Sequence, residues 1–172
     1  MEYTKSAEIK ALSHSPRVTV LGLGNMLLSD EGVGIHIVQR LDGIMDEFDV
    51  DLIDGGTSPD ALPLVGSVEK LIIVDAVKAG NEPGTMYRLS CDDLASDPAD
   101  HVSLHEIGVL DSLKMVTLLD RQPKSTVIIG IEPKIIDYGL ELSSEVEEKL
   151  PEVINLILKE VEETNTAMEV DR

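Results

Sequence analysis

Four side chains able to bind a metal or move a proton stand where predicted strands end or helices begin. Asp54 and Asp75 close two predicted strands, and His105 precedes a predicted helix. Glu31 opens the helix that follows a glycine-rich loop. Each of the four alone has an ordinary structural interpretation, as a helix-terminal charge, a turn former or a hydrogen-bonding residue.

Together, the four residues allow a more specific interpretation. The carboxyl ends of parallel strands meet at one edge of a sheet, where α/β proteins bind their ligands. Two carboxylates and an imidazole meeting there would make a site for a divalent ion such as zinc or nickel, with coordination positions left open.

The glycine-rich loop from Gly22 to Gly34 could also be a dinucleotide-binding fingerprint. That fingerprint needs a third glycine where this chain has Leu27. Asp30 and Glu31 would also repel a pyrophosphate at the start of the helix. The loop is therefore better suited to a cation.

The hydrophobic pattern predicts a single α/β domain, with a mainly parallel twisted sheet of about five strands and helices on both faces. The predicted strands are 17–22, 49–54, 70–75, 84–90 and 125–131. One predicted helix starts at Gly34 and has an apolar stripe through Ile44 and Met45, and another spans 108–121. Residues 59–65 could form only a short helix. A capping box of Ser144 and Glu147 begins the last helix, which Pro151 should kink or divide. We expect a flexible leader over 1–16, the domain over 17–163 and a frayed tail over 164–172.

Composition excludes several classes of function. The 33 acidic and 14 basic side chains leave a net charge of -19, which disfavours binding to nucleic acid or to anionic membranes. No apolar run is long enough for a membrane helix or a signal peptide. The single cysteine, Cys91, has no partner for an internal disulfide, so we expect a cytoplasmic protein.

Several motifs, in order along most of the chain, resemble the maturation endopeptidases of nickel-iron hydrogenases. They are GLGNMLLSDEGVG at 22–34, DGGT at 54–57, IIVDA at 72–76, PGTM at 83–86, SLHEIG at 103–108 and IEPKIIDYGLELS at 131–143. The leader before Val18 is longer than this family leads us to expect, and the 91–101 loop is unusually acidic.

The resemblance implies an endopeptidase that removes a short C-terminal extension from the nickel-loaded large-subunit precursor of a hydrogenase. It implies that Glu31, Asp75 and His105 contact the metal and that Asp54 takes part in cleavage or substrate recognition. The nickel would come with the precursor, no organic cofactor is expected, and the free protein should be a monomer. We expect the substrate to meet two loops, through Gly24, Asn25, Asp30, Gly55, Gly56 and Thr57.

Two alternatives remain open from the residues themselves. A metallohydrolase could hold its own zinc in the same cluster and cleave peptides without nickel. A non-catalytic module that binds a metal or a nucleotide could share the same architecture, because a fold does not fix a function.

Overall fold

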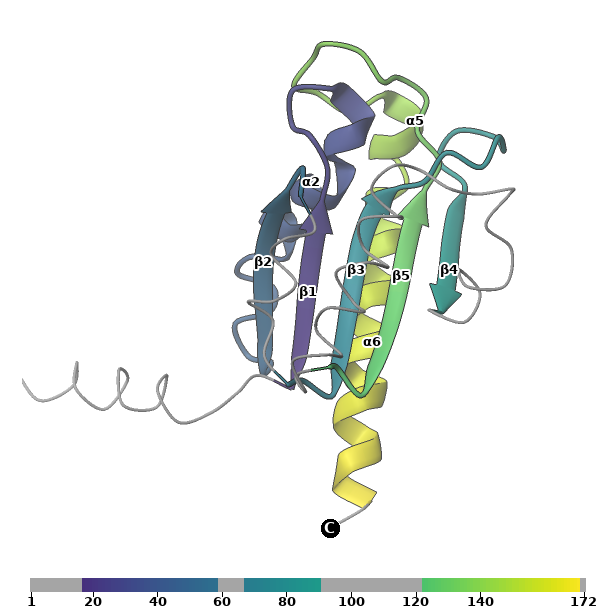
Figure 1. Cartoon of the computed structure of the whole chain (residues 1–172). Coiled ribbons are helices and arrows are strands. Elements are labelled where there is room, and N and C mark those ends of the chain that lie inside the picture. The colour runs from purple at the N-terminus through teal and green to yellow at the C-terminus, as the bar shows by residue number, and fades with distance from the viewer. Residues whose placement is uncertain (1–16, 59–66, 91–121, 171–172) are drawn as a thin grey trace, which may run out of the picture.

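Five strands form one sheet in the order β2-β1-β3-β5-β4 (Figure 1). The structure is a computed structural model and describes residues 17–58, 67–90 and 122–170. Strands β1 (Val18–Leu23), β2 (Val50–Gly56), β3 (Lys70–Ala76) and β5 (Ser125–Ile131) run parallel. The edge strand β4 (Met86–Ser90) is antiparallel to β5. The predicted α/β domain with a mainly parallel sheet is confirmed.

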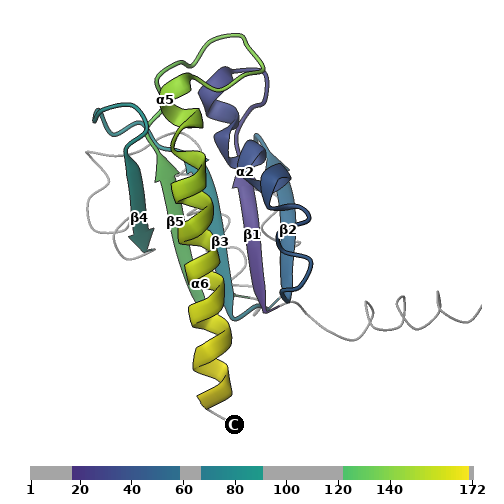
Figure 2. The same cartoon turned by 180° about the vertical axis from the view of Figure 1, so that it is seen from behind.

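Helices α2 (Val33–Leu41) and α6 (Leu150–Val170) cover one face of this sheet (Figure 2). Ile37 of α2 and Ile157 of α6 pack with Ile72 of β3 in one apolar cluster. Leu21 and Ile73, which point to the opposite face, are also completely buried. Burial on both faces explains why these strands read as continuous apolar runs. The helices predicted at 59–65 and 108–121 lie outside the described residues.

Helix α2 ends earlier than its apolar stripe predicts. Asp42 leaves the helical conformation with φ -57° and ψ 129°, and Gly43 follows at φ +80°, a value that favours glycine. Ile44 is consequently 46% exposed, whereas Met45 folds back and is buried. The prediction of one helix through both residues was wrong because a local turn competes with the periodic pattern.

The C-terminal helices begin differently from the predicted capping box. Ser143, not Ser144, is the residue before α5 (Ser144–Glu147), and its hydroxyl donates to Asp30 instead of capping the helix. Pro151 does divide the helical region, since α6 begins beside it as a separate helix after α5. The proline lies in the first turn of α6, where its missing N–H breaks no helical hydrogen bond. Helix α6 then continues to Val170, beyond the position near Thr164 where polar composition predicts fraying.

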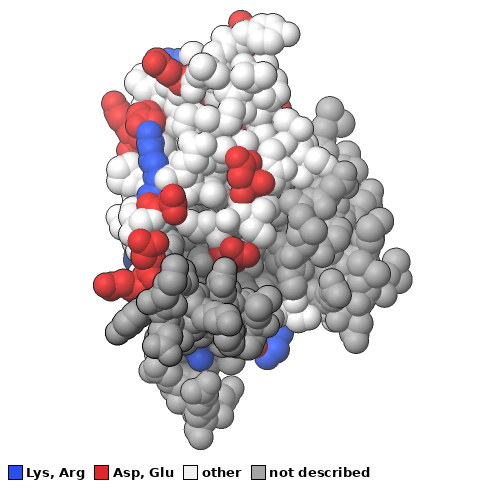
Figure 3. All heavy atoms as spheres, turned by 90° about the vertical axis from the view of Figure 1, so that its left-hand side faces the viewer, with Lys and Arg blue, Asp and Glu red and all other residues white. Residues whose placement is uncertain are grey.

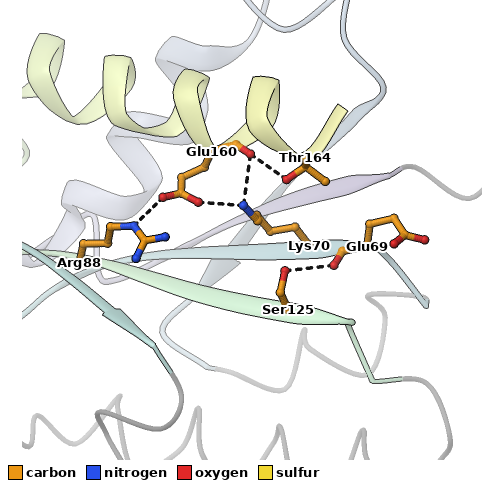
Figure 4. A network of polar contacts seen from close by, with 6 residues as sticks. All are labelled: Glu69, Lys70, Arg88, Ser125, Glu160 and Thr164. Atoms are coloured by element: carbon orange, nitrogen blue, oxygen red, sulfur yellow. Dashed lines mark hydrogen bonds and ion pairs between the residues drawn. The ribbon is translucent and has the colours of Figure 1, made fainter. Parts of the chain in front are cut away.

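A buried glutamate ties α6 to the sheet (Figure 4). Glu160 is 3% exposed, and its carboxylate binds Lys70 Nζ at 2.9 Å and Arg88 Nε at 2.5 Å. Burial opposes ionisation of Glu160, but the hydrogen bonds from the two cations outweigh it and lower the pKa of the carboxyl. One side chain thus joins α6, β3 and β4.

Within the described ranges, no helix is long and apolar enough to cross a membrane.

Candidate active site at the carboxyl edge of the sheet

The carboxyl ends of the parallel strands lie together at the upper edge of the sheet in Figure 1. Strand β2 lies on one side of β1 and β3 lies on the other, so the order in which strands are added to the sheet reverses at β1. Such a switch point leaves a crevice where α/β proteins bind ligands. The loop after β1, which carries Glu31, and the end of β3, which carries Asp75, meet at this point.

Close backbone packing fixes the loop that carries Glu31. Gly24 has φ +136°, its N–H donates to the Gly56 carbonyl at 2.9 Å, and a Cβ there would lie 1.9 Å from the Glu31 carbonyl oxygen. Glu31 itself lies in the short 3-10 helix η1 (Ser29–Gly32) and is partly exposed. Only glycine allows this approach, so the GxG pattern serves the shape of the loop.

A second glycine brings the start of α2 against β3. A Cβ on Gly34 would lie 2.2 Å from the Val74 carbonyl oxygen and 2.3 Å from that of Leu23. Because Val74 directly precedes Asp75, this contact holds the segment after Glu31 against the end of β3. The structure therefore brings the segments that carry Glu31 and Asp75 to the same edge.

Asp75 is buried next to the end of its strand. It is 2% exposed, and its Oδ1 accepts a hydrogen bond from the Ala76 N–H at 2.8 Å. Side chains alternate along a strand, so Asp75 points to the same face as Ile73, away from α2 and α6.

Asp54 is at the same edge but has a different environment. Its side chain is exposed, and its Oδ1 accepts a hydrogen bond from the Gly56 N–H at 2.9 Å, which stabilises the turn at the end of β2. Gly22 pairs with Asp54 on one side and with Val74 on the other. Asp54 is thus two strands from Val74, roughly 10 Å at the usual strand spacing. An exposed carboxylate here is accessible to a bound chain.

Asp30 takes a structural position. Its carboxylate is 0% exposed and accepts hydrogen bonds from the N–H groups of Lys134 and Ile135, both at 2.8 Å. The N–H and hydroxyl of Ser143 donate to it at 2.7 and 2.8 Å. These four donors occupy the Asp30 carboxylate, and its expected contact with a substrate stays a prediction. Asp30 joins the first loop to the segment 134–143.

The other loop residues lie nearer the surface. Asn25 is partly exposed and accepts a hydrogen bond from the Leu27 N–H at 3.0 Å. Gly55 and Gly56 are partly exposed, and Thr57 is exposed. Gly56 has φ +57°, a conformation that favours glycine in the turn beside Asp54.

Sequence reasoning missed Glu132 at the end of β5. This glutamate is 3% exposed and accepts hydrogen bonds from the N–H groups of Ala79 and Gly80, at 2.9 and 3.0 Å, and from the Tyr87 hydroxyl at 2.5 Å. Burial opposes its ionisation, but these donors lower its pKa. Glu132 thus shapes the connection that follows Asp75. Its position directly after β5 was the available signal.

The predicted metal site stays a prediction. Within 17–58, 67–90 and 122–170, the structure has no group of three histidine, cysteine, aspartate or glutamate side chains able to hold a metal ion. Glu31 and Asp75 belong to segments at the same edge, and the third expected ligand, His105, lies outside the described residues. The predicted set of two carboxylates and one imidazole has the ligand types that suit a divalent ion such as nickel.

Comparison with known proteins identifies the family. A family model described as hydrogenase maturation protease matches residues 35–160. The chain is 31% identical to the hydrogenase 2 maturation protease of Escherichia coli, over 86% of this chain and 92% of that one. It is 35% identical to the hydrogenase expression/formation protein HupD of Thiocapsa roseopersicina, over 84% of this chain and 67% of that one.

A solved structure agrees with this assignment. The hydrogenase maturating endopeptidase HybD from E. coli superposes with a TM-score of 0.76 at 30% identity, covering 86% of this chain and 93% of that one. Sequence and fold therefore agree on a peptidase, and the chain belongs to the hydrogenase maturation protease family.

Proposed function

We propose that this protease removes a short C-terminal extension from the large-subunit precursor of a nickel-iron hydrogenase after nickel insertion, and that it docks on the substrate's nickel. Membership of the family supports the reaction class. The observation that carries the nickel docking is the meeting of the Glu31 and Asp75 segments at the switch point beside β1. Carboxylates on a rigid strand end and a tightly packed loop are suited to recognising a metal that arrives with the substrate.

In this proposal Glu31, Asp75 and His105 complete the coordination of the precursor's nickel and so fix the position of the scissile peptide. The metal, as a Lewis acid, would polarise the peptide carbonyl or a bound water. Precursor without nickel would lose these contacts and bind more weakly. The protease would thereby distinguish loaded from unloaded precursor.

Asp54 would act on the proton of the attacking water. Hydrolysis adds water to the carbonyl carbon, breaks the C–N bond and leaves a proton for the departing amine. The exposed Asp54 carboxylate could accept that proton and return it to the amine, or orient the water. The turn through Gly55, Gly56 and Thr57, with Gly24 and Asn25 opposite, would hold the extended peptide.

We further propose that the unit formed by residues 17–163 carries the activity and that the free enzyme is a cytoplasmic monomer. The net charge of -19 would oppose self-association. The reducing cytoplasm would suit a chain with one cysteine.

The decisive experiment mixes the purified protein with its large-subunit precursor, with and without nickel, and weighs the precursor by mass spectrometry. We expect loss of a short C-terminal peptide from the nickel-loaded form only, and much slower loss with Glu31→Gln. Glu47→Gln, at an exposed acid in the connection between α2 and β2, is the matched control and should cleave normally.

Other outcomes would contradict the proposal. Cleavage of both precursor forms, with about one metal bound per chain, would favour a resident-zinc hydrolase. An intact precursor with a folded protease would favour a non-catalytic binding module.

A further inference from the structure

Exposed apolar side chains gather beside the candidate site. The described residues include six large hydrophobic side chains that are highly exposed. Five of them belong to two segments, 25–29 and 133–142, and we call these five the apolar edge surface: Leu27 60%, Ile135 43%, Ile136 47%, Tyr138 90% and Leu140 63%. The sixth, Ile44, is 46% exposed and follows the far end of α2. Single exposed apolar residues are ordinary, but such a gathering marks an interaction site.

The two segments that carry this surface are bonded to each other. The Ser29 N–H donates to the Gly139 carbonyl at 2.9 Å, and the Gly139 N–H donates to the Leu27 carbonyl at 3.0 Å. The Ser29 hydroxyl donates to the Asp137 carbonyl at 3.0 Å. The buried Asp30 carboxylate accepts hydrogen bonds from the N–H groups of Lys134, near the start of the second segment, and of Ser143, the residue that follows it. The exposed side chains therefore stand on a fixed backbone, which reduces the entropy lost on binding.

The apolar edge surface adjoins the candidate active site. Leu27 and Glu31 belong to the same loop, and the Glu31 N–H donates to the Leu28 carbonyl at 3.2 Å. In Figure 1 the segment after β5 passes over the top of the molecule to reach this loop. Figure 3 shows the left-hand side of Figure 1, where the upper part is mostly uncharged and acidic side chains lie along one margin and near the middle. A partner bound at the site would also lie against these side chains.

We propose that the apolar edge surface is the docking surface for the folded body of the hydrogenase large-subunit precursor, which would present an apolar patch ringed by lysine and arginine. This inference rests on the proposed function. Asp137 and Glu141 are exposed beside the apolar side chains, and the whole chain carries a charge of -19. Lys134 of the same segment is also exposed, but it is paired with Glu145. These negative charges complement a basic partner, and they would repel a second copy of the same surface.

The test compares the wild-type protein with the double variant Tyr138→Ser, Leu140→Ser, and with Leu27→Ser as a second probe. These side chains are exposed, so the melting temperatures should match the wild type. We expect the KM for nickel-loaded precursor to rise about tenfold in the double variant, with kcat little changed, because truncating interface residues of this kind removes binding energy. Ile44→Ser is the matched control, equally apolar and exposed but distant, and should leave KM unchanged.

Two results would overturn the docking surface while the proposed function stands. The first is an unchanged KM in both variants when the wild type cleaves the precursor. The second is a wild-type dimer by light scattering that the double variant converts to a monomer, since the surface would then bind a second copy. Failure of the wild type to cleave loaded precursor would instead overturn the proposed function.

Discussion

Asp30 and Ser143 are hydrogen-bonded to each other through two pairs of atoms across 113 positions of the chain. The Ser143 N–H donates to Asp30 Oδ1 at 2.7 Å, and the Ser143 hydroxyl donates to Oδ2 at 2.8 Å. Ser143 immediately precedes α5, so this link sets where the C-terminal helices start. The first loop and the last helical region thus hold each other in place.

Replacing Asp30 with asparagine should destabilise the fold. An amide group can accept hydrogen bonds through its oxygen only. In the variant its NH2 would therefore face N–H or O–H groups that in the wild type donate to the carboxylate. We expect Asp30→Asn to lower the free energy of unfolding by about 2–4 kcal/mol, measured by urea denaturation. The exposed Asp46→Asn serves as control and should change it by less than about 0.5 kcal/mol. Equal stability of both variants would contradict the role assigned to Asp30.

Gly34→Ala should force α2 away from β3. The added methyl group would overlap the Val74 and Leu23 carbonyl oxygens, and the cost should be about 2–3 kcal/mol in thermal or urea unfolding. Gly43→Ala tests backbone strain without crowding. The φ there is +80°, but nothing lies within 4 Å of the position that the added Cβ would take. That variant should cost only about 1 kcal/mol. A smaller loss for Gly34 than for Gly43 would refute the close approach.

Glu31→Gln should impair processing while the protein stays folded. Glutamine keeps the size of the side chain but removes the charge that would bind the precursor's nickel. We expect kcat/KM for loaded precursor to fall about a hundredfold or more, as loss of substrate positioning does elsewhere. Circular dichroism should be unchanged. Activity within twofold of wild type would remove Glu31 from the site.

Stability should fall in acid because of Glu160. Its pKa is lower in the folded protein than its ordinary value of 4.5, so the native state binds a proton less readily than the unfolded state. The stabilisation is present above about pH 4.5 and is lost as the pH falls through the folded-state pKa.

We therefore expect the difference in unfolding free energy between the wild type and Glu160→Gln to shrink between pH 7 and acid pH. Urea denaturation across that range measures the difference. The exposed Glu148→Gln is the control and should show no such trend. A difference that is the same at every pH would rule out ionisation of Glu160 as its source.

Lys70→Met should show how much the Glu160 pair contributes. The Lys70 side chain is 13% exposed, and its removal leaves the Glu160 carboxylate buried with only one cation. We expect a loss of about 2–3 kcal/mol in urea unfolding. Arg88→Met should cost less, because the Arg88 side chain is half exposed and its ion pair is weakened by water. The reverse order would contradict this ranking.

Local sequence patterns predicted the strands well and the helix boundaries less well. The predicted strand 125–131 matches β5 exactly, and 70–75 falls one residue short of the end of β3. Apolar runs buried on both faces give this signal directly. The end of α2 was missed because the Asp42-Gly43 turn breaks a stripe that periodicity alone would continue.

The place of the candidate residues was predicted where it depends on strand ends, and their contacts were missed where they depend on distant partners. The pattern placed Asp54 and Asp75 at the carboxyl edge of the sheet because each closes a predicted strand. The buried state of Asp30 depends on donors more than 100 positions away, and Ser143 was overlooked because its hydroxyl serves Asp30 rather than its own helix. No local pattern contains these partners.

The link between Asp30 and the segment 134–143 also has a consequence for biosynthesis. A ribosome makes the loop around Glu31 early, but the groups that bind Asp30 are added only after β5. A nascent chain therefore cannot assemble this edge of the sheet, however well its first strands have folded. The new protein can complete this edge of the sheet only after residues 134–143 have been made, so a chain that stops before them would lack it.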